Sequence, residues 1–276
     1  MKIAVLGGGG FIGSAIIDRL LLDGHCIRVF ERPRIDSYRP FGAQEQVEWT
    51  NGDFMSQHDV RKAVSGVDTV MHLVSTTLPK SSNDDPIFDV QSNLVASVQL
   101  LRLMVEERVG KIVFISSGGT VYGQPRYLPM DELHPTEPQV SYGITKLAIE
   151  KYMSMFHRLH GLKPVILRVA NPYGMRQRVE TAQGAVAVFL DRALRGQPVE
   201  IWGGRKRRAR LHPCLGRRRG LCQGLGVRRC RTGIQRGNRT RHLAERTGAN
   251  HRIGHRAERQ GGLQAGTTFR RSCQCP

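Results

Sequence analysis

A tyrosine and a lysine four residues apart are the pair whose spacing most directly suggests chemistry. Tyr142 and Lys146 lie in the segment SYGITK. On a helix, two positions four apart share one face, so the Lys146 ammonium would lie beside the Tyr142 phenol. That charge would lower the phenol pKa from about 10 toward neutral pH. The pair therefore predicts a general acid/base, whereas a surface tyrosine beside a lysine is the alternative for this spacing alone.

A glycine-rich turn near the N-terminus could bind the phosphates of a dinucleotide. Gly7, Gly10 and Gly13 form the pattern G-x-x-G-x-x-G between an apolar run at 3–6 and apolar residues at helical spacing over 11–21. In such a unit the first glycine permits the turn, the second lets the backbone approach a pyrophosphate, and the third lets helix and strand pack closely. The phosphates would lie at the helix N-terminus, where free N–H groups favour anions.

Glu31 ends the next predicted strand and bears on the choice of dinucleotide. A carboxylate at this place can accept both ribose hydroxyls of NAD and would repel a 2′-phosphate. The neighbouring Arg32 could pair with that phosphate, and a solvated charge at a strand end is the other interpretation of Glu31. We favour NAD over NADP.

Strands and helices alternate along the first part of the chain. A helix is predicted over 90–105, and apolar strands are predicted at 3–6, 27–30, 47–50, 67–74, 111–116 and 164–169. This alternation predicts an α/β fold of Rossmann type, a parallel sheet with helices on both faces. The hydroxyl-rich segment 116–123 follows a strand directly, at the end of the sheet where such folds bind ligands.

Composition separates the chain into two parts. The 276 residues are 39% hydrophobic, and the formal net charge is +19. Residues 205–276 hold 20 of the 42 Lys and Arg but only two acids, Glu245 and Glu258, so the rest of the chain is nearly neutral. No apolar run reaches the roughly 20 residues of a membrane helix, and no export signal is found, so we expect a cytoplasmic protein without a membrane partner.

These motifs together resemble the extended short-chain dehydrogenases/reductases, in particular the NAD-dependent nucleotide-sugar epimerases and dehydratases similar to UDP-glucose 4-epimerase. The resemblance covers residues 1–204 and rests on GGGGFIG, VDTVMHLVS, QSNLVAS, ISSGGTVYG, SYGITK and LRVANPYG. It implies NAD as the cofactor, a UDP-sugar as substrate and a homodimer. It also implies 4-epimerisation through a transient 4-keto sugar, with a reductase or dehydratase as the alternative.

The resemblance also implies roles for single residues. The base would be Tyr142, and Lys146 would bind the nicotinamide ribose. The substrate would meet Ser117, Tyr142 and Asn171. The cofactor would be held by Gly7, Gly10, Phe11, Ile12, Gly13, Glu31, Asp53, Phe54, Leu73, Val74, Ser75, Asn93 and Lys146.

The chain departs from the family pattern at one important position. Family members usually carry a catalytic Ser or Thr three residues before the Val of V-Y-G, and this chain has Gly118 there. Ser117 and Thr120 flank the position, so either could supply the catalytic hydroxyl. A dehydratase would need an additional acid/base pair beside that hydroxyl, where the chain has Gly118 and Gly119. This favours an epimerase or a reductase.

Three segments follow from this comparison: a Rossmann domain with the catalytic helix at 1–174, the start of a substrate domain at 175–204, and an Arg-rich tail at 205–276. The tail has 19 Arg, one Lys and one aromatic residue, Phe269, and too few apolar residues to form a core. One interpretation is a nucleic-acid-binding arm, which would place the protein in a different functional class.

The interpretation that we favour is a one-base insertion near Gly203 and Gly204. With plausible codons, deleting one G there turns the following text into WGDGSVVRDYIHVSDVAEAFAKAL, the continuation expected of the family. Amphipathic periodicity returns over about seventy codons. The tail then needs neither a nucleic-acid partner nor a metal site for its cysteines and histidines. The printed chain would carry an incomplete, poorly ordered substrate lobe and have impaired activity.

Three residues outside these motifs receive structural interpretations. We expect His72 to be a strand-end histidine rather than a ligand, and Cys26 to be a buried small hydrophobe. The helix that contains Met153 is expected to contribute to the core or to a subunit interface.

Overall fold

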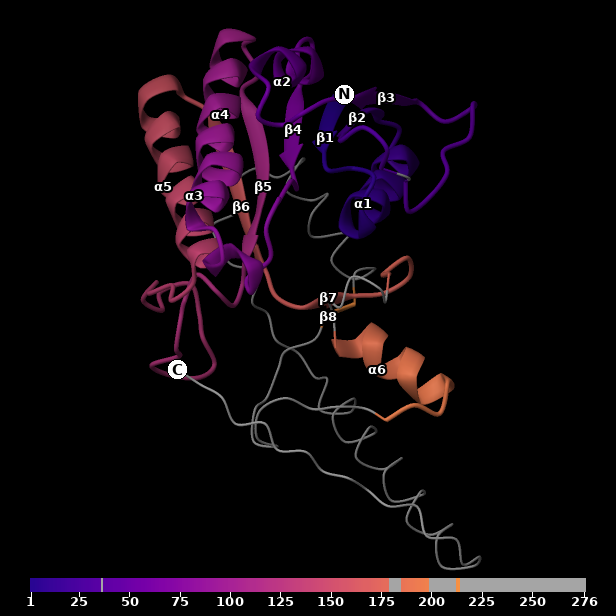
Figure 1. The fold of residues 1–276 in the computed structure, drawn as a ribbon. Coiled ribbons are helices and arrows are strands. Elements are labelled where there is room, and N and C mark those ends of the chain that lie inside the picture. The colour runs from indigo at the N-terminus through magenta and orange to yellow at the C-terminus, as the bar shows by residue number, and fades with distance from the viewer. Residues whose placement is uncertain (36, 179–184, 199–211, 214–276) are drawn as a thin grey trace, which may run out of the picture. The chain divides into compact units, whose positions relative to one another are not determined.

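A six-stranded parallel sheet organises the computed structural model, which describes residues 1–35, 37–178, 185–198 and 212–213 (Figure 1). The strand order is β3-β2-β1-β4-β5-β6, and every neighbouring pair is parallel. The predicted Rossmann-type sheet is confirmed. Its order reverses between β1 and β4, which is where such sheets form a ligand crevice. The strands are β1 (Lys2–Leu6), β2 (Cys26–Glu31), β3 (Val47–Asn51), β4 (Thr69–His72), β5 (Lys111–Ser117) and β6 (Lys163–Val169).

Helical segments connect these strands. They are α1 (Phe11–Leu22), α2 (Gln57–Val64), η1 (Ser81–Asn83), α3 (Pro86–Asp89), η2 (Val90–Val95), α4 (Ala96–Glu106), α5 (Ser141–His160) and α6 (Ala185–Leu194). The helix predicted over 90–105 is in fact two segments, the π-helical stretch η2 and then α4, and α3 directly precedes them. Two short strands, β7 (Pro172–Tyr173) and β8 (His212–Pro213), pair in parallel outside the main sheet.

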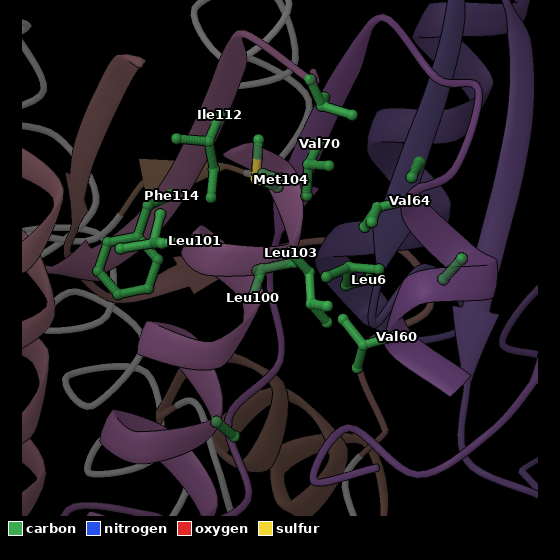
Figure 2. Packing of buried hydrophobic residues seen from close by; sticks show 14 of the residues in the cluster. Leu6, Val60, Val64, Val70, Leu100, Leu101, Leu103, Met104, Ile112 and Phe114 are labelled. Atoms are coloured by element: carbon green, nitrogen blue, oxygen red, sulfur yellow. The ribbon is translucent and has the colours of Figure 1, made fainter. Parts of the chain in front are cut away.

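The core has one layer on each face of the sheet. The α1 side chains Ile16, Ile17 and Leu20 pack on one face, against residues of β1 and β2. On the other face, α2, α4 and α5 share one cluster with β1, β4 and β5. Figure 2 shows side chains from α4 packed among Val60 and Val64 of α2 and residues of those strands. The two layers hold the strand ends in place for the site described below.

Two structural expectations have clear outcomes. Cys26 is exposed, so the prediction of a buried residue was wrong. It is the first residue of β2, directly after the turn that ends α1, and its thiol donates to the Gln46 side chain at 2.8 Å. Met153 and Phe156 of α5 are buried in the core of this chain.

No described helix is long and apolar enough to cross a membrane.

The structure describes the three predicted segments to different extents. Most of 1–174 is described, and 175–204 is described in part. The Arg-rich segment 205–276 lies outside the described residues except for the two residues of β8. The predicted insertion and the proposed origin of that segment therefore stay predictions.

Candidate active site

The glycine turn between β1 and α1 brings backbone atoms into close contact. Gly7 adopts a left-handed φ of +82°, and a β-carbon on it would lie 3.3 Å from the backbone of Leu73 and Val74. A β-carbon on Gly13 would lie 2.4 Å from the carbonyl oxygen of Gly7. Gly10 is the N-cap of α1, and no side chain caps the helix there. This uncapped helix start, reached through a turn without side chains, fits a pyrophosphate. Phe11 and Ile12 open α1 and are half-buried.

Glu31 faces the same turn. Its carboxylate accepts the Gly9 N–H at 3.2 Å and the Arg32 N–H at 3.1 Å. A carboxylate held beside the glycine turn is placed as expected for a ribose-binding residue of an NAD enzyme. The Arg32 side chain is exposed, so NAD over NADP stays a prediction.

Asp53 and Phe54 follow β3 and differ in what they offer a ligand. The Asp53 carboxylate is exposed and accepts the Met55 N–H at 2.9 Å. The Phe54 side chain is only 4% exposed and packs with its ring centroid 5.0 Å from that of His72. The ring belongs to the core, so the adenine contact implied by the resemblance could come only from the Phe54 backbone.

The segment after β4 passes beside the glycine turn and is shaped by Asn93. Leu73 and Val74 meet Gly7, as given above, and Ser75 comes next. Asn93 is 3% exposed; its side-chain oxygen accepts the Thr76 N–H at 3.0 Å and its amide donates to the Thr76 hydroxyl at 2.7 Å. Asn93 thus supports this loop from within η2, and its part in holding the cofactor stays a prediction.

Tyr142 and Lys146 lie together on α5. The Lys146 ammonium is 5.5 Å from the centroid of the Tyr142 ring and 4.9 Å from that of Phe114, and it donates to the Ile115 carbonyl at 3.4 Å. Lys146 is 3% exposed. The Tyr142 N–H donates to the Ser82 hydroxyl at 3.0 Å, so the acid/base pair of α5 lies at the segment that follows β4.

The electrostatics of the pair differ from the sequence-based expectation. Burial raises the pKa of Tyr142, the Ser75 side chain opposes that rise, and the Asp89 charge adds to it. The expected lowering by Lys146 was wrong, because burial of the phenol dominates. Burial lowers the pKa of Lys146 to about 8, partly offset by Asp89. The amine is therefore charged only at neutral or lower pH.

The hydroxyls at the end of β5 have different environments. The Ser117 hydroxyl oxygen accepts the Thr120 N–H at 3.1 Å and the Gly119 N–H at 3.4 Å, which leaves its own O–H to donate. The Thr120 hydroxyl is buried without a hydrogen-bond partner among the described residues. A β-carbon on Gly118 would lie 2.9 Å from the Arg168 carbonyl oxygen. Position 118 therefore has no room for a hydroxyl side chain in this backbone.

Asn171 and His72 differ in exposure. Asn171 follows β6, is exposed, and has a φ of +39°. His72 is buried and bonds to the Ser97 hydroxyl at 2.8 Å, and burial together with the Lys146 charge lowers its pKa well below the usual value. It is a neutral core histidine in this protein.

Sequence reasoning missed Asp89, a fully buried carboxylate that bonds to α5. A signal for it exists in the chain. Asp89, Asn93 and Ser97 are spaced by four and continue, toward the N-terminus, the buried stripe of α4 that includes Leu100 and Met104. Polar residues on a buried helical stripe point to a hydrogen-bonded site.

Comparison with known proteins agrees with this geometry. A model described as the NAD dependent epimerase/dehydratase family matches residues 3–213. The chain belongs to this family. Its fold is similar to solved structures of extended short-chain dehydrogenase/reductase type, among them UDP-glucose 4-epimerases. The family includes epimerases, reductases and dehydratases.

Three similar proteins illustrate the range of this epimerase/dehydratase family. A UDP-glucose 4-epimerase of Mycolicibacterium smegmatis is 33% identical over 208 residues, covering 74% of this chain and 66% of the relative. A dTDP-4-dehydro-6-deoxyglucose reductase of Escherichia coli is 30% identical, covering 73% and 65%. The crystal structure of the Thermus thermophilus UDP-glucose 4-epimerase with NAD is 29% identical with a TM-score of 0.74, covering 82% of this chain and 75% of that one. The chain thus spans slightly less than two thirds of these two curated relatives.

Proposed function

We propose that the chain binds NAD and derives from a nucleotide-sugar 4-epimerase of the UDP-glucose/UDP-galactose type. The observation that carries the proposal is the pairing of Tyr142 with the buried Lys146, 5.5 Å from its ring centroid, at the start of a helix that the segment after β4 caps. A proton acceptor beside a dinucleotide site is what oxidation of a sugar alcohol requires. The similarity to two UDP-glucose 4-epimerases supports the substrate class.

The site residues would act in the following order. Ser117 would donate its O–H to the sugar oxygen, and Tyr142 would take the proton of the sugar 4-hydroxyl. Bound NAD⁺ would supply the hydride acceptor and later the hydride donor. After the 4-keto sugar rotates in the site and presents its other face, Tyr142 would return the proton. The product is then an isomer, with no net oxidation or reduction. Lys146 would bind a ribose hydroxyl. Asn171 would contact the substrate.

The alternative within the family is a reductase, which the 30% identical Escherichia coli protein supports. A reductase consumes one reduced nicotinamide per product, whereas an epimerase leaves the cofactor pool unchanged. A dehydratase fits less well, because Gly118 and Gly119 stand where its additional acid/base pair would be needed.

An isomerase assay on the full chain tests the proposal. Purified protein with UDP-galactose and NAD⁺ should form UDP-glucose, read by chromatography, at a rate reduced by the proposed change of reading frame after Gly203. Tyr142→Phe should lower that rate by about 100-fold or more. Tyr152→Phe, on the same helix and 39% exposed, is the matched control and should keep it. Equal rates for the parent and Tyr142→Phe, or accumulation of reduced cofactor in step with product, would contradict the epimerase mechanism.

Further proposals concern the assembly, the location and the gene of this protein. We propose a homodimer and a cytoplasmic location for the intact parent protein. The one-base insertion near Gly203 would explain the Arg-rich segment without a nucleic-acid partner. Restoring the frame should then restore full turnover.

A further inference from the structure

We infer that Asp89 is a positioning residue for the acid/base pair: its carboxylate ties the loop after β4 to the first two turns of α5 and so fixes the start of that helix, which carries Tyr142, beside the loop. The inference rests on the proposed function for the meaning of Tyr142. The contacts themselves do not depend on it.

The Asp89 carboxylate joins segments that are far apart in the sequence. One oxygen accepts from the Thr77 hydroxyl and, at 3.0 Å, from the Asn93 amide. The other oxygen accepts the hydroxyl protons of Ser141 and Thr145, each at 2.7 Å. The side chain is fully buried. A buried carboxylate is costly unless it is hydrogen-bonded, so these four donors and the carboxylate hold one another in place.

The two donors on α5 are placed around the acid/base pair. Ser141 directly precedes Tyr142, and Thr145 directly precedes Lys146. A shift or rotation of the start of α5 would break both bonds to Asp89. The other two donors are Thr77 of the loop after β4 and Asn93 of η2. Asn93 also accepts the N–H of Thr76 in the same loop. Asp89 thereby fixes the distance between α5 and the loop that carries Ser75.

A second set of contacts acts in the same direction. The N-cap of α5, Val140, makes no side-chain capping bond. The Ser141 N–H instead donates to the Asn83 side chain at 3.0 Å, and the Tyr142 N–H donates to the Ser82 hydroxyl at 3.0 Å. Segment 75–93 therefore supplies both the caps and the buried anchor of the helix that carries Tyr142.

The ionisable groups that act on the pair are few among the described residues. Asp89 of α3 raises the pKa of both Tyr142 and Lys146. His72 of β4 is kept neutral by burial and by Lys146. A change that keeps the Asp89 charge but loosens its bonds therefore leaves burial, which raises the pKa of Tyr142, and the Ser75 side chain, which lowers it, as the variables for the phenol.

The test uses the full chain with Thr145→Val and, as the matched control, Thr145→Ser. Valine keeps the shape of this buried side chain and removes the donor, whereas serine keeps the donor. Two quantities are measured: the NAD⁺ dissociation constant by protein fluorescence, and the ionisation midpoint of Tyr142. The midpoint comes from tyrosinate absorbance within seconds of a pH jump, as the difference from the same protein carrying Tyr142→Phe.

We expect Thr145→Val to weaken NAD⁺ binding several-fold, because the loop after β4 loosens. We also expect it to raise the Tyr142 midpoint, because the phenol moves away from the Ser75 side chain, which lowers its pKa. Thr145→Ser should match the parent in both. A purely structural role would instead expose the phenol to water and lower the midpoint. A lowered or unchanged midpoint in Thr145→Val would overturn the inference.

Two further variants keep the inference testable. If Thr145→Val does not fold, Ser141→Ala removes the other donor of α5 and carries the same expectation. Asp89→Asn should also weaken NAD⁺ binding, whereas Asp84→Asn, which removes an exposed charge from the same segment, should not. If the parent chain binds no NAD⁺, the proposed function fails in its cofactor, and the phenol titration still decides the role of Asp89.

Discussion

The carbonyl oxygen of Gly7 lies 2.4 Å from the place that a β-carbon of Gly13 would occupy. The first and third glycines of the turn therefore depend on each other: the strand end can approach α1 only because position 13 has no side chain. Gly10, between them, is different. A β-carbon there would have the Gly7 carbonyl at 3.7 Å as its nearest neighbour, an ordinary contact.

This difference predicts unequal effects of alanine in the turn. Gly13→Ala should lower the free energy of unfolding by about 1–3 kcal/mol or more, because backbone must move. Gly10→Ala should cost at most about 1 kcal/mol, because position 10 has extended backbone and only a capping preference is lost. Urea unfolding of the two variants measures both. Equal destabilisation would show that the turn relaxes freely.

The Glu31 carboxylate beside Gly9 predicts the choice between NAD and NADP. Glu31→Gln should weaken NAD⁺ binding and narrow the preference over NADP⁺, because the negative charge that repels a 2′-phosphate is removed. Arg32→Ala should weaken NADP⁺ binding only if the guanidinium pairs with that phosphate. Dissociation constants of both cofactors for the three proteins provide the measurement. A preference unchanged by Glu31→Gln would contradict the assigned role.

The buried Lys146 predicts a pH-dependent stability. Its pKa in the folded protein is about 8, below the ordinary 10.5, so the unfolded chain binds this proton more tightly. Stability should therefore rise with pH between about 8 and 10.5, and the full penalty should apply below pH 8. Lys146→Met should stabilise the protein at pH 7 by on the order of 2 kcal/mol. The gain should shrink toward pH 10 in thermal unfolding, and a gain independent of pH would contradict the titration.

The two hydroxyls near Gly118 should respond differently to removal. Ser117→Ala should lower turnover and also loosen the turn whose N–H groups the serine accepts. Thr120→Val should keep turnover and leave stability unchanged or higher, because it replaces a buried hydroxyl that lacks a partner among the described residues. Loss of turnover in Thr120→Val would make Thr120 the catalytic hydroxyl. Gly118→Ser should destabilise the protein, given the 2.9 Å approach to the Arg168 carbonyl.

The proposed insertion can be tested directly on the gene. Sequencing source DNA across codons 200–210 should show one G fewer than the printed chain requires. The corrected protein should then convert UDP-sugars at a normal rate. If the additional G is present in the source, the printed chain is the true product, and normal turnover by that product would contradict the proposed impairment.

Much of the fold could be predicted because parallel strands leave a strong local pattern. All six predicted strands are present, and β1, β2, β3, β5 and β6 each extend one residue beyond the prediction at one or both ends. β4 is shorter than the predicted 67–74, since pairing with β1 ends at His72 and the chain then turns along the glycine turn. α2 was missed: at eight residues it is short and mostly polar, and its N-cap Ser56 is the main local signal.

The site could be predicted only where its residues are close in sequence. The spacing of Tyr142 and Lys146 was sufficient to place them on one face. The contacts of Asp89 with Ser141 and Thr145 span more than fifty residues, and no local pattern encodes them. The direction of the Tyr142 pKa shift was wrong for the same reason, because burial by distant segments outweighs the nearby lysine.

The capping of α5 by a distant segment has a consequence for local unfolding of the protein. Because Ser82 and Asn83 accept the first N–H groups of α5, those amides cannot be protected from hydrogen exchange unless η1 is docked. The start of α5 and the segment around η1 should thus open as one cooperative unit, even though they are nearly sixty residues apart. A chain in which that unit is open has no assembled acid/base pair, so the fraction of competent molecules is set by a local unfolding equilibrium rather than by the global stability of the sheet.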